Sequence, residues 1–101
     1  MVKHIVMWKM KNREKSVTEN ADALELKKRL LALKDLVPSL RHIEIGLNDK
    51  SASPDNHEIV LVSDFDDMDG LKEYIIHPEH VKVGAFVREV TEARTCIDYQ
   101  Y

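Results

Sequence analysis

Hydrophobic and polar residues alternate along the first ten positions of the chain. The even positions share one side of an extended segment and are Val2, His4, Val6, Trp8 and Met10. The odd positions share the other side and are Lys3, Ile5, Met7 and Lys9. A period of two in residues that favour extended backbone predicts a β-strand over residues 2–10. Because both sides carry apolar side chains, we expect both faces of this strand to be covered.

Three later segments show the pattern of strands. Residues 40–47 alternate, residues 57–65 are apolar in both directions, and residues 95–101 end the chain with a shorter pattern of the same kind. The two-sided segment places Ile59, Leu61 and Phe65 against Val60 and Val62. A strand of that kind is typical of a sheet that is covered on both faces.

Helical spacing separates these strands. Apolar residues recur at steps of three and four at positions 23, 26, 30, 33 and 37, and Leu24 and Leu31 widen this stripe. Ser16 and Glu19 have the spacing of a capping box, so we expect the helix to begin there and to end before Pro38.

Two shorter helices are predicted over residues 68–76 and 78–90, separated by a proline. Pro78 disfavours helical backbone at His77 but suits the first turn of a following helix. His77 is then the N-cap, and Ile76 and Val81 occupy the positions of a hydrophobic staple.

The order strand, helix, strand, strand, helices, strand predicts a single domain over residues 1–101. Two-layer packing of these elements gives a ferredoxin-like α+β fold, with an antiparallel sheet and helices on one face. The chain has no element left to cover the other face. A second copy packed through a two-fold axis would cover it, so we expect a homodimer that buries Ile5 and Met7, or their opposite-parity neighbours.

Composition and charge exclude several classes of partner. The net charge is −3, with 15 basic residues interspersed among 18 acidic ones, so we expect no nucleic-acid partner. No apolar run approaches the roughly 20 residues that span a bilayer, so we expect no membrane insertion and a cytoplasmic location. Cys96 is the only cysteine, which rules out an internal disulfide and favours a buried thiol in a strand.

The segment YIIHPEH concentrates residues capable of proton chemistry. If the corner brings Tyr74 and His80 together near the sheet, His80 could act as a general base, with the Tyr74 hydroxyl bonding a developing oxyanion. His4 shares its side of the first strand with Trp8 and is a candidate third polar group beside the same cavity. The pattern His77-x-x-His80 is a weak metal motif, so we expect neither a metal nor another cofactor.

Structural roles explain much of the same motif. His77 as a helix cap and His80 as a buried histidine require no ligand. Trp8 and the leucine stripe are more typical of a hydrophobic core than of a cofactor site, and His42 and His57 lie near strand ends where solvent reaches them.

Five segments taken together resemble the stress-responsive A/B barrel (Dabb) family. They are MVKHIVMWKMK, HEIVLVSDF, DDMDGLKEY, HPEHVKV and the ending CIDYQY. The resemblance covers nearly the whole chain and implies a homodimeric α+β barrel. The corner is especially similar to that of a plant polyketide cyclase in this family, which implies His80 as general base, Tyr74 as its assistant and His4 as a pocket residue. Ile59 takes the place of a further pocket histidine.

These observations favour a homodimeric Dabb domain with a pocket between helices and sheet, lined by His4, Trp8, Ile59 and His77 near the catalytic candidates. The expected ligand is a small apolar or polyketide-like molecule. One alternative is a cofactor-independent cyclase or isomerase that uses a histidine base and a tyrosine. The other is a stress-associated structural protein whose function is assembly.

Overall fold

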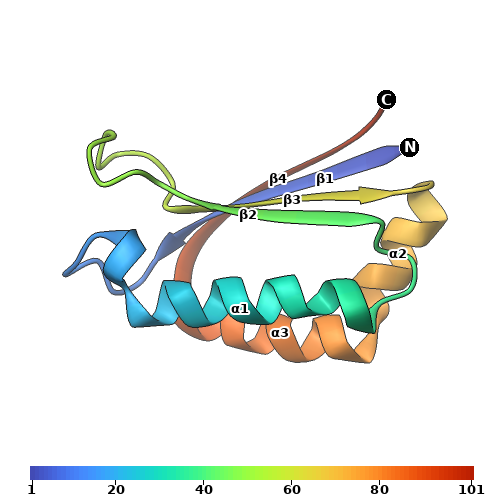
Figure 1. The fold of residues 1–101 in the computed structure, drawn as a ribbon, viewed down its shortest axis with the longest axis horizontal. Coiled ribbons are helices and arrows are strands. Elements are labelled where there is room, and N and C mark those ends of the chain that lie inside the picture. Colours follow the sequence, from blue (N-terminus) through green and yellow to red (C-terminus); the bar gives the residue numbers. More distant parts are fainter.

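The chain, described over residues 1–101 by a computed structural model, forms a four-stranded sheet with its helices on one face (Figure 1). The strands are β1 (Val2–Met10), β2 (His42–Leu47), β3 (Ile59–Phe65) and β4 (Thr91–Gln100). The helices are α1 (Ala21–Leu36), α2 (Met68–Ile76) and α3 (Pro78–Val90), and a short 3₁₀ turn, η1 (Val17–Glu19), precedes α1. This arrangement confirms the predicted ferredoxin-like α+β fold.

The sheet has the order β2-β3-β1-β4, and every neighbouring pair is antiparallel. β1 therefore lies between β3 and β4. Its register places His4 opposite Asp98 of β4, and Trp8 opposite Arg94 of the same strand. Because residues opposite one another in an antiparallel pair project from the same face, Asp98 and Arg94 share the helix-covered face with His4 and Trp8.

The two sides of β1 have different environments. The even positions, which are Val2, His4, Val6, Trp8 and Met10, are all buried, whereas the odd positions are half-buried or exposed. The even side packs with the buried stripe of α1, formed by Ala23, Leu26, Leu30 and Leu33. The prediction that Leu24 and Leu31 widen this stripe was wrong, because both lie on the solvent side of α1.

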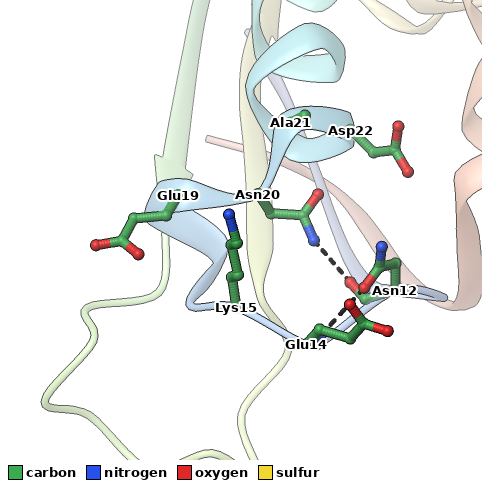
Figure 2. A pocket seen from close by; sticks show the side chains of 7 residues that line it. All are labelled: Asn12, Glu14, Lys15, Glu19, Asn20, Ala21 and Asp22. Atoms are coloured by element: carbon green, nitrogen blue, oxygen red, sulfur yellow. Dashed lines mark hydrogen bonds between the residues drawn. The ribbon is translucent and has the colours of Figure 1, made fainter.

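The predicted start of α1 was also wrong. Ser16 precedes only the single turn η1 and makes no capping hydrogen bond, and α1 begins after Asn20. The Asn20 side chain accepts a hydrogen bond from the Ala23 amide at 3.0 Å. It also donates one to the Asn12 carbonyl at 2.7 Å (Figure 2). Asn20 thus caps the helix and ties it to the preceding loop, a combination that a capping-box pattern does not include.

The corner between α2 and α3 follows the sequence prediction at its cap. His77 has extended backbone, its Nδ1 accepts a hydrogen bond from the Glu79 amide at 3.1 Å, and Pro78 occupies the first turn of α3. The predicted staple is not a buried contact, because Ile76 and Val81 remain 75% and 53% exposed.

Strand ends differ modestly from the predicted ones. β2 and β3 each begin two residues later than expected, and β4 begins at Thr91 rather than Thr95. β4 follows α3 without an intervening loop. At this junction the Thr91 hydroxyl donates a hydrogen bond to the Val87 carbonyl at 2.7 Å. Its first residues, Thr-Glu-Ala-Arg, are mostly polar, so they carry no alternating pattern. Cys96 on this edge strand is half-buried rather than buried.

The length and hydropathy of the helices can be compared with the prediction that no segment inserts into a membrane. No helix combines the length and the apolar character needed to cross a bilayer.

Candidate functional site

A cavity of about 350 Å³ lies between the helices and the β1 and β4 side of the sheet. Its wall is mainly apolar and includes Val6, Trp8, Leu30, Leu61, Val83 and Val87. Its polar side chains are His4, Tyr74, His80, Arg88 and Arg94. A mainly apolar cavity in which a small number of polar groups converge is typical of a small-molecule site. By contrast, the hollow of Figure 2 at the start of α1 has one apolar residue in its wall.

Tyr74 and His80 meet in this cavity, with ring centroids 4.3 Å apart. Tyr74 is only 1% exposed and packs against Phe65, with ring centroids 5.1 Å apart. Burial raises the pKa of the Tyr74 hydroxyl well above its usual value of about 10. The phenol therefore stays protonated at neutral pH and remains a hydrogen-bond donor.

His80 is held in one orientation by a hydrogen bond with the Ile75 carbonyl, 3.1 Å from its Nδ1. A carbonyl oxygen can only accept, so Nδ1 carries the proton and donates. Burial lowers the pKa of His80, the nearby charges of His4 and Arg94 lower it further, and the bond to Ile75 opposes these effects. The neutral ring keeps a lone pair on Nε2, which is the atom free to accept a proton.

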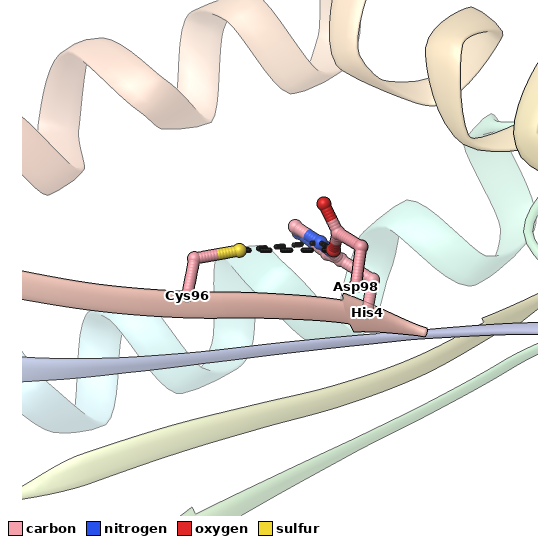
Figure 3. A group of neighbouring side chains, drawn as sticks. All are labelled: His4, Cys96 and Asp98. Atoms are coloured by element: carbon pink, nitrogen blue, oxygen red, sulfur yellow. Dashed lines mark hydrogen bonds and ion pairs between the residues drawn. The ribbon is translucent and has the colours of Figure 1, made fainter. Parts of the chain in front are cut away.

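His4 is the buried polar residue on the β1 side of the cavity. It is 5% exposed, and its ring stands edge-on to Tyr74 with centroids 6.1 Å apart. Its Nδ1 is hydrogen-bonded to the Asp98 carboxylate across the β1–β4 pair, as Figure 3 shows. The carboxylate fixes the orientation of the ring, so His4 is positioned from the edge strand.

Cys96 lies beside this pair. Its Sγ is 3.7 Å from His4 Nδ1 and 3.7 Å from the Asp98 carboxylate (Figure 3). Burial and the charge of Asp98 raise the pKa of the thiol, which makes it a poor nucleophile at neutral pH. Donor atoms of His4, Cys96 and Asp98 lie within 4.8 Å of one another, a set of types that suits Zn²⁺. A metal there would have to replace the bond between His4 and Asp98.

The structure gathers four of the six candidate site residues around one cavity: His4, Trp8, Tyr74 and His80. Ile59 and His77 do not line it. Ile59 is buried in the core opposite Trp8, and His77 is occupied as the cap of α3. Sequence reasoning missed Arg88, Arg94, Cys96 and Asp98. Arg94, Cys96 and Asp98 are spaced two apart and so project from the same side of β4. Only the register with β1 places them beside His4 and Trp8.

Fold and cavity together define a ferredoxin-like α+β domain with an aromatic and histidine-lined chamber under its sheet. The chain belongs to the Stress responsive A/B Barrel Domain (Dabb) family, whose model matches residues 2–101.

Three relatives illustrate the range of this fold. Olivetolic acid cyclase from Cannabis sativa is 30% identical over 100 residues, which cover 97% of this chain and 94% of that protein. A dimeric ferredoxin-like protein of unknown function from Bacteroides fragilis is 36% identical, with a TM-score of 0.83 over 99% of this chain and 95% of its own. Hydroxynitrile lyase from Passiflora edulis shares the fold at 14% identity and a TM-score of 0.80, covering 97% and 90% of the two chains.

The lowered pKa of His80 predicts how its ring titrates. In an NMR titration of the histidine ring protons, assigned with His80→Asn, we expect a midpoint for His80 below 6.5. Since the unfolded chain then binds this proton more readily than the folded chain, His80 should reduce the free energy of unfolding as pH falls below about 6.5. Denaturant titrations should show a weaker acid-side loss in His80→Asn. A midpoint at or above 6.5 would contradict the described environment.

Proposed function

We propose that this protein is a homodimer that binds a small organic molecule in the cavity between its helices and sheet. The observation that carries the proposal is the convergence of Tyr74, His80 and His4 on a chamber whose remaining wall is mainly apolar. The proposed dimer contact and the proposed ligand site lie on opposite faces of the same sheet.

The open face of the sheet supports the dimer. The odd positions of β1 point there, with Ile5 opposite Val62 of β3 and Ile97 of β4, and Met7 opposite Val60. Met7 is 37% exposed and Ile97 58% exposed in the single chain. A contiguous apolar strip across the middle of a sheet is a typical interface, and the similar protein from Bacteroides fragilis is dimeric.

A charge placed on the open face should therefore weaken the dimer. Ile97→Lys should raise the dimer dissociation constant at least about tenfold, because a lysine in the apolar strip loses its solvation when two sheets meet. Sedimentation equilibrium over a range of protein concentrations measures this. Leu24→Lys is the matched control, since Leu24 is 45% exposed on the solvent side of α1. A wild-type protein that stays monomeric at high concentration would exclude the dimer.

The cavity supports the ligand. It lies within the size range of small-molecule sites, roughly 300–1,000 Å³. Trp8, its largest apolar side chain, is also the only tryptophan of the chain, so a single indole N–H resonance reports on the cavity.

Filling the cavity should block a small aromatic probe. We expect p-cresol to shift the Trp8 indole resonance saturably in ¹H–¹⁵N spectra, and Val83→Phe to weaken this binding about fivefold or more by occupying the space. Val81→Phe is the control, because Val81 is two residues away on the same helix and 53% exposed. A well-folded dimer whose indole resonance does not respond to the probe would favour a purely structural role for the protein.

A second candidate function is a cofactor-independent cyclase or isomerase. It is favoured by the contact between Tyr74 and His80, whose neutral Nε2 is available as a base, and by the similarity to olivetolic acid cyclase. Nε2 would take a proton from the carbon next to a carbonyl, and the Tyr74 hydroxyl would donate a hydrogen bond to the enolate oxygen that forms. In an aldol ring closure this carbon then attacks a second carbonyl of the same chain, and the imidazolium returns the proton to the new alkoxide.

This candidate predicts a specific loss of turnover. With a linear poly-β-ketide thioester as substrate, His80→Gln should lower kcat by about 10²–10⁴, the usual contribution of a general base. Tyr74→Phe should lower kcat with a smaller effect on KM, since its bond to oxygen strengthens in the transition state. Activity should rise with pH through a midpoint below 6.5. His42→Gln, on the exposed end of β2, is the control. No ring-closed product above the uncatalysed rate would rule this activity out for that substrate class.

A further inference from the structure

Arginines near the cavity differ from the other arginines of the chain in having no acidic partner. Arg13, Arg29 and Arg41 form ion pairs with Glu92, Glu25 and Asp66 respectively. Arg88 on α3 and Arg94 on β4 form none, and both line the cavity from its exposed edge. Neither guanidinium group is paired with a carboxylate, so both are available to an anion at the cavity, and Arg94 lies beside the Cys96 thiol.

Trp8 has an unsatisfied donor at the same cavity. It is 5% exposed, and its Nε1–H is buried without any hydrogen-bond partner. An indole nitrogen can only donate, and leaving such a group buried and unpaired is costly. Trp8 lines the cavity and stands opposite Arg94 in the β1–β4 register. A ligand atom that reached the indole nitrogen from the cavity would supply the missing acceptor.

The permanent charges that line the cavity are the positive charges of Arg88 and Arg94. The Asp98 carboxylate, which does not line it, is bonded to His4. No aspartate or glutamate lines the cavity, and its ionisable groups besides the tyrosine phenol are two histidines and two arginines. The positive charge of Arg94 reaches His80, where it contributes to lowering the pKa of the imidazole. An anionic group would be attracted to this wall, whereas a cation would be repelled.

We infer that the cavity is selective for an organic anion, with a carboxylate bound by Arg94 and Arg88, an oxygen accepting from Trp8 Nε1–H, and an apolar body among the aliphatic wall residues. The inference rests on the proposed ligand-binding function and specifies the class of its ligand. Arginine suits this role because its planar fork of N–H donors matches a carboxylate in two parallel hydrogen bonds. The apolar end would lie among Val6, Leu61 and Val83, which line the same cavity.

A matched pair of ligands tests this selectivity. Octanoate and octanamide have similar shape but differ in charge, and their dissociation constants can be measured at pH 7 from the Trp8 indole resonance. We expect octanoate to bind about tenfold more tightly than octanamide or better, with the indole proton shifting downfield as it gains an acceptor. Higher salt should weaken octanoate binding, because both arginines are exposed.

Variants locate the charge that recognises the anion. Arg94→Gln should weaken octanoate at least about tenfold and change octanamide little, since glutamine keeps hydrogen-bonding capacity but loses the charge. Arg94 is exposed on an edge strand, so this substitution should leave the fold intact. Arg41→Gln is the control, because it removes the same charge from a surface ion pair with Asp66 outside the cavity.

The outcomes separate this inference from the proposed function. Equal affinities for octanoate and octanamide, or an unchanged octanoate affinity in Arg94→Gln, would overturn anion selectivity while leaving a ligand-binding cavity. Failure of octanoate, octanamide and p-cresol alike to bind the wild-type dimer would overturn the proposed cavity and the anion selectivity with it.

Discussion

The alternation of side chains along β1 is the constraint on which the rest of the structure depends. β1 is bonded to β3 on one side and β4 on the other, so its two faces become the two faces of the sheet centre. Its even positions build the core and the cavity, and its odd positions build the open apolar strip. A shift of one residue in register would exchange these sets, burying Lys3 and Lys9 under the helices and exposing His4 and Trp8. One strand thus fixes both the position of the candidate site and the surface offered to a second copy.

Pro78 supplies the second constraint by dividing one potential helix into α2 and α3. In a continuous helix Tyr74 and His80 would be six residues apart and would not share a face, because helical neighbours are three or four positions apart. The extended backbone at His77 turns the chain so that the two rings approach to 4.3 Å. The same turn places Ile75 where its carbonyl accepts from His80. The cap at His77 is therefore a structural role that has a chemical consequence, since it sets the tautomer of the residue three positions later.

Much of this architecture could be predicted from local patterns, because periods of two and 3.6 specify strands, helices and their buried sides. The bounds of β1, α2 and α3 follow from such patterns, and so does the cap at His77. The start of α1 did not follow, since it depends on Asn20 reaching Asn12, a contact outside the helix. The polar side chains around the cavity also could not be predicted from local sequence patterns. Asp98 and Arg94 approach His4 and Trp8 only through pairing of the first and last strands, and sequence spacing carries no information about register across so long a separation.

The placement of Arg94 links recognition of a ligand to the chemistry of His80. Arg94 helps to lower the pKa of His80 through its positive charge, so a carboxylate that neutralised Arg94 would raise that pKa towards its ordinary value. A ligand that also expelled water from the cavity would lower it, because burial is the largest cause of the shift. These effects oppose one another at the same imidazole. If the net effect raises the pKa of His80, an anion binds together with proton uptake, and if it lowers that pKa, binding releases a proton. By linkage, binding then strengthens in acid in the first case and in base in the second. A neutral ligand in the same chamber could produce only the second effect.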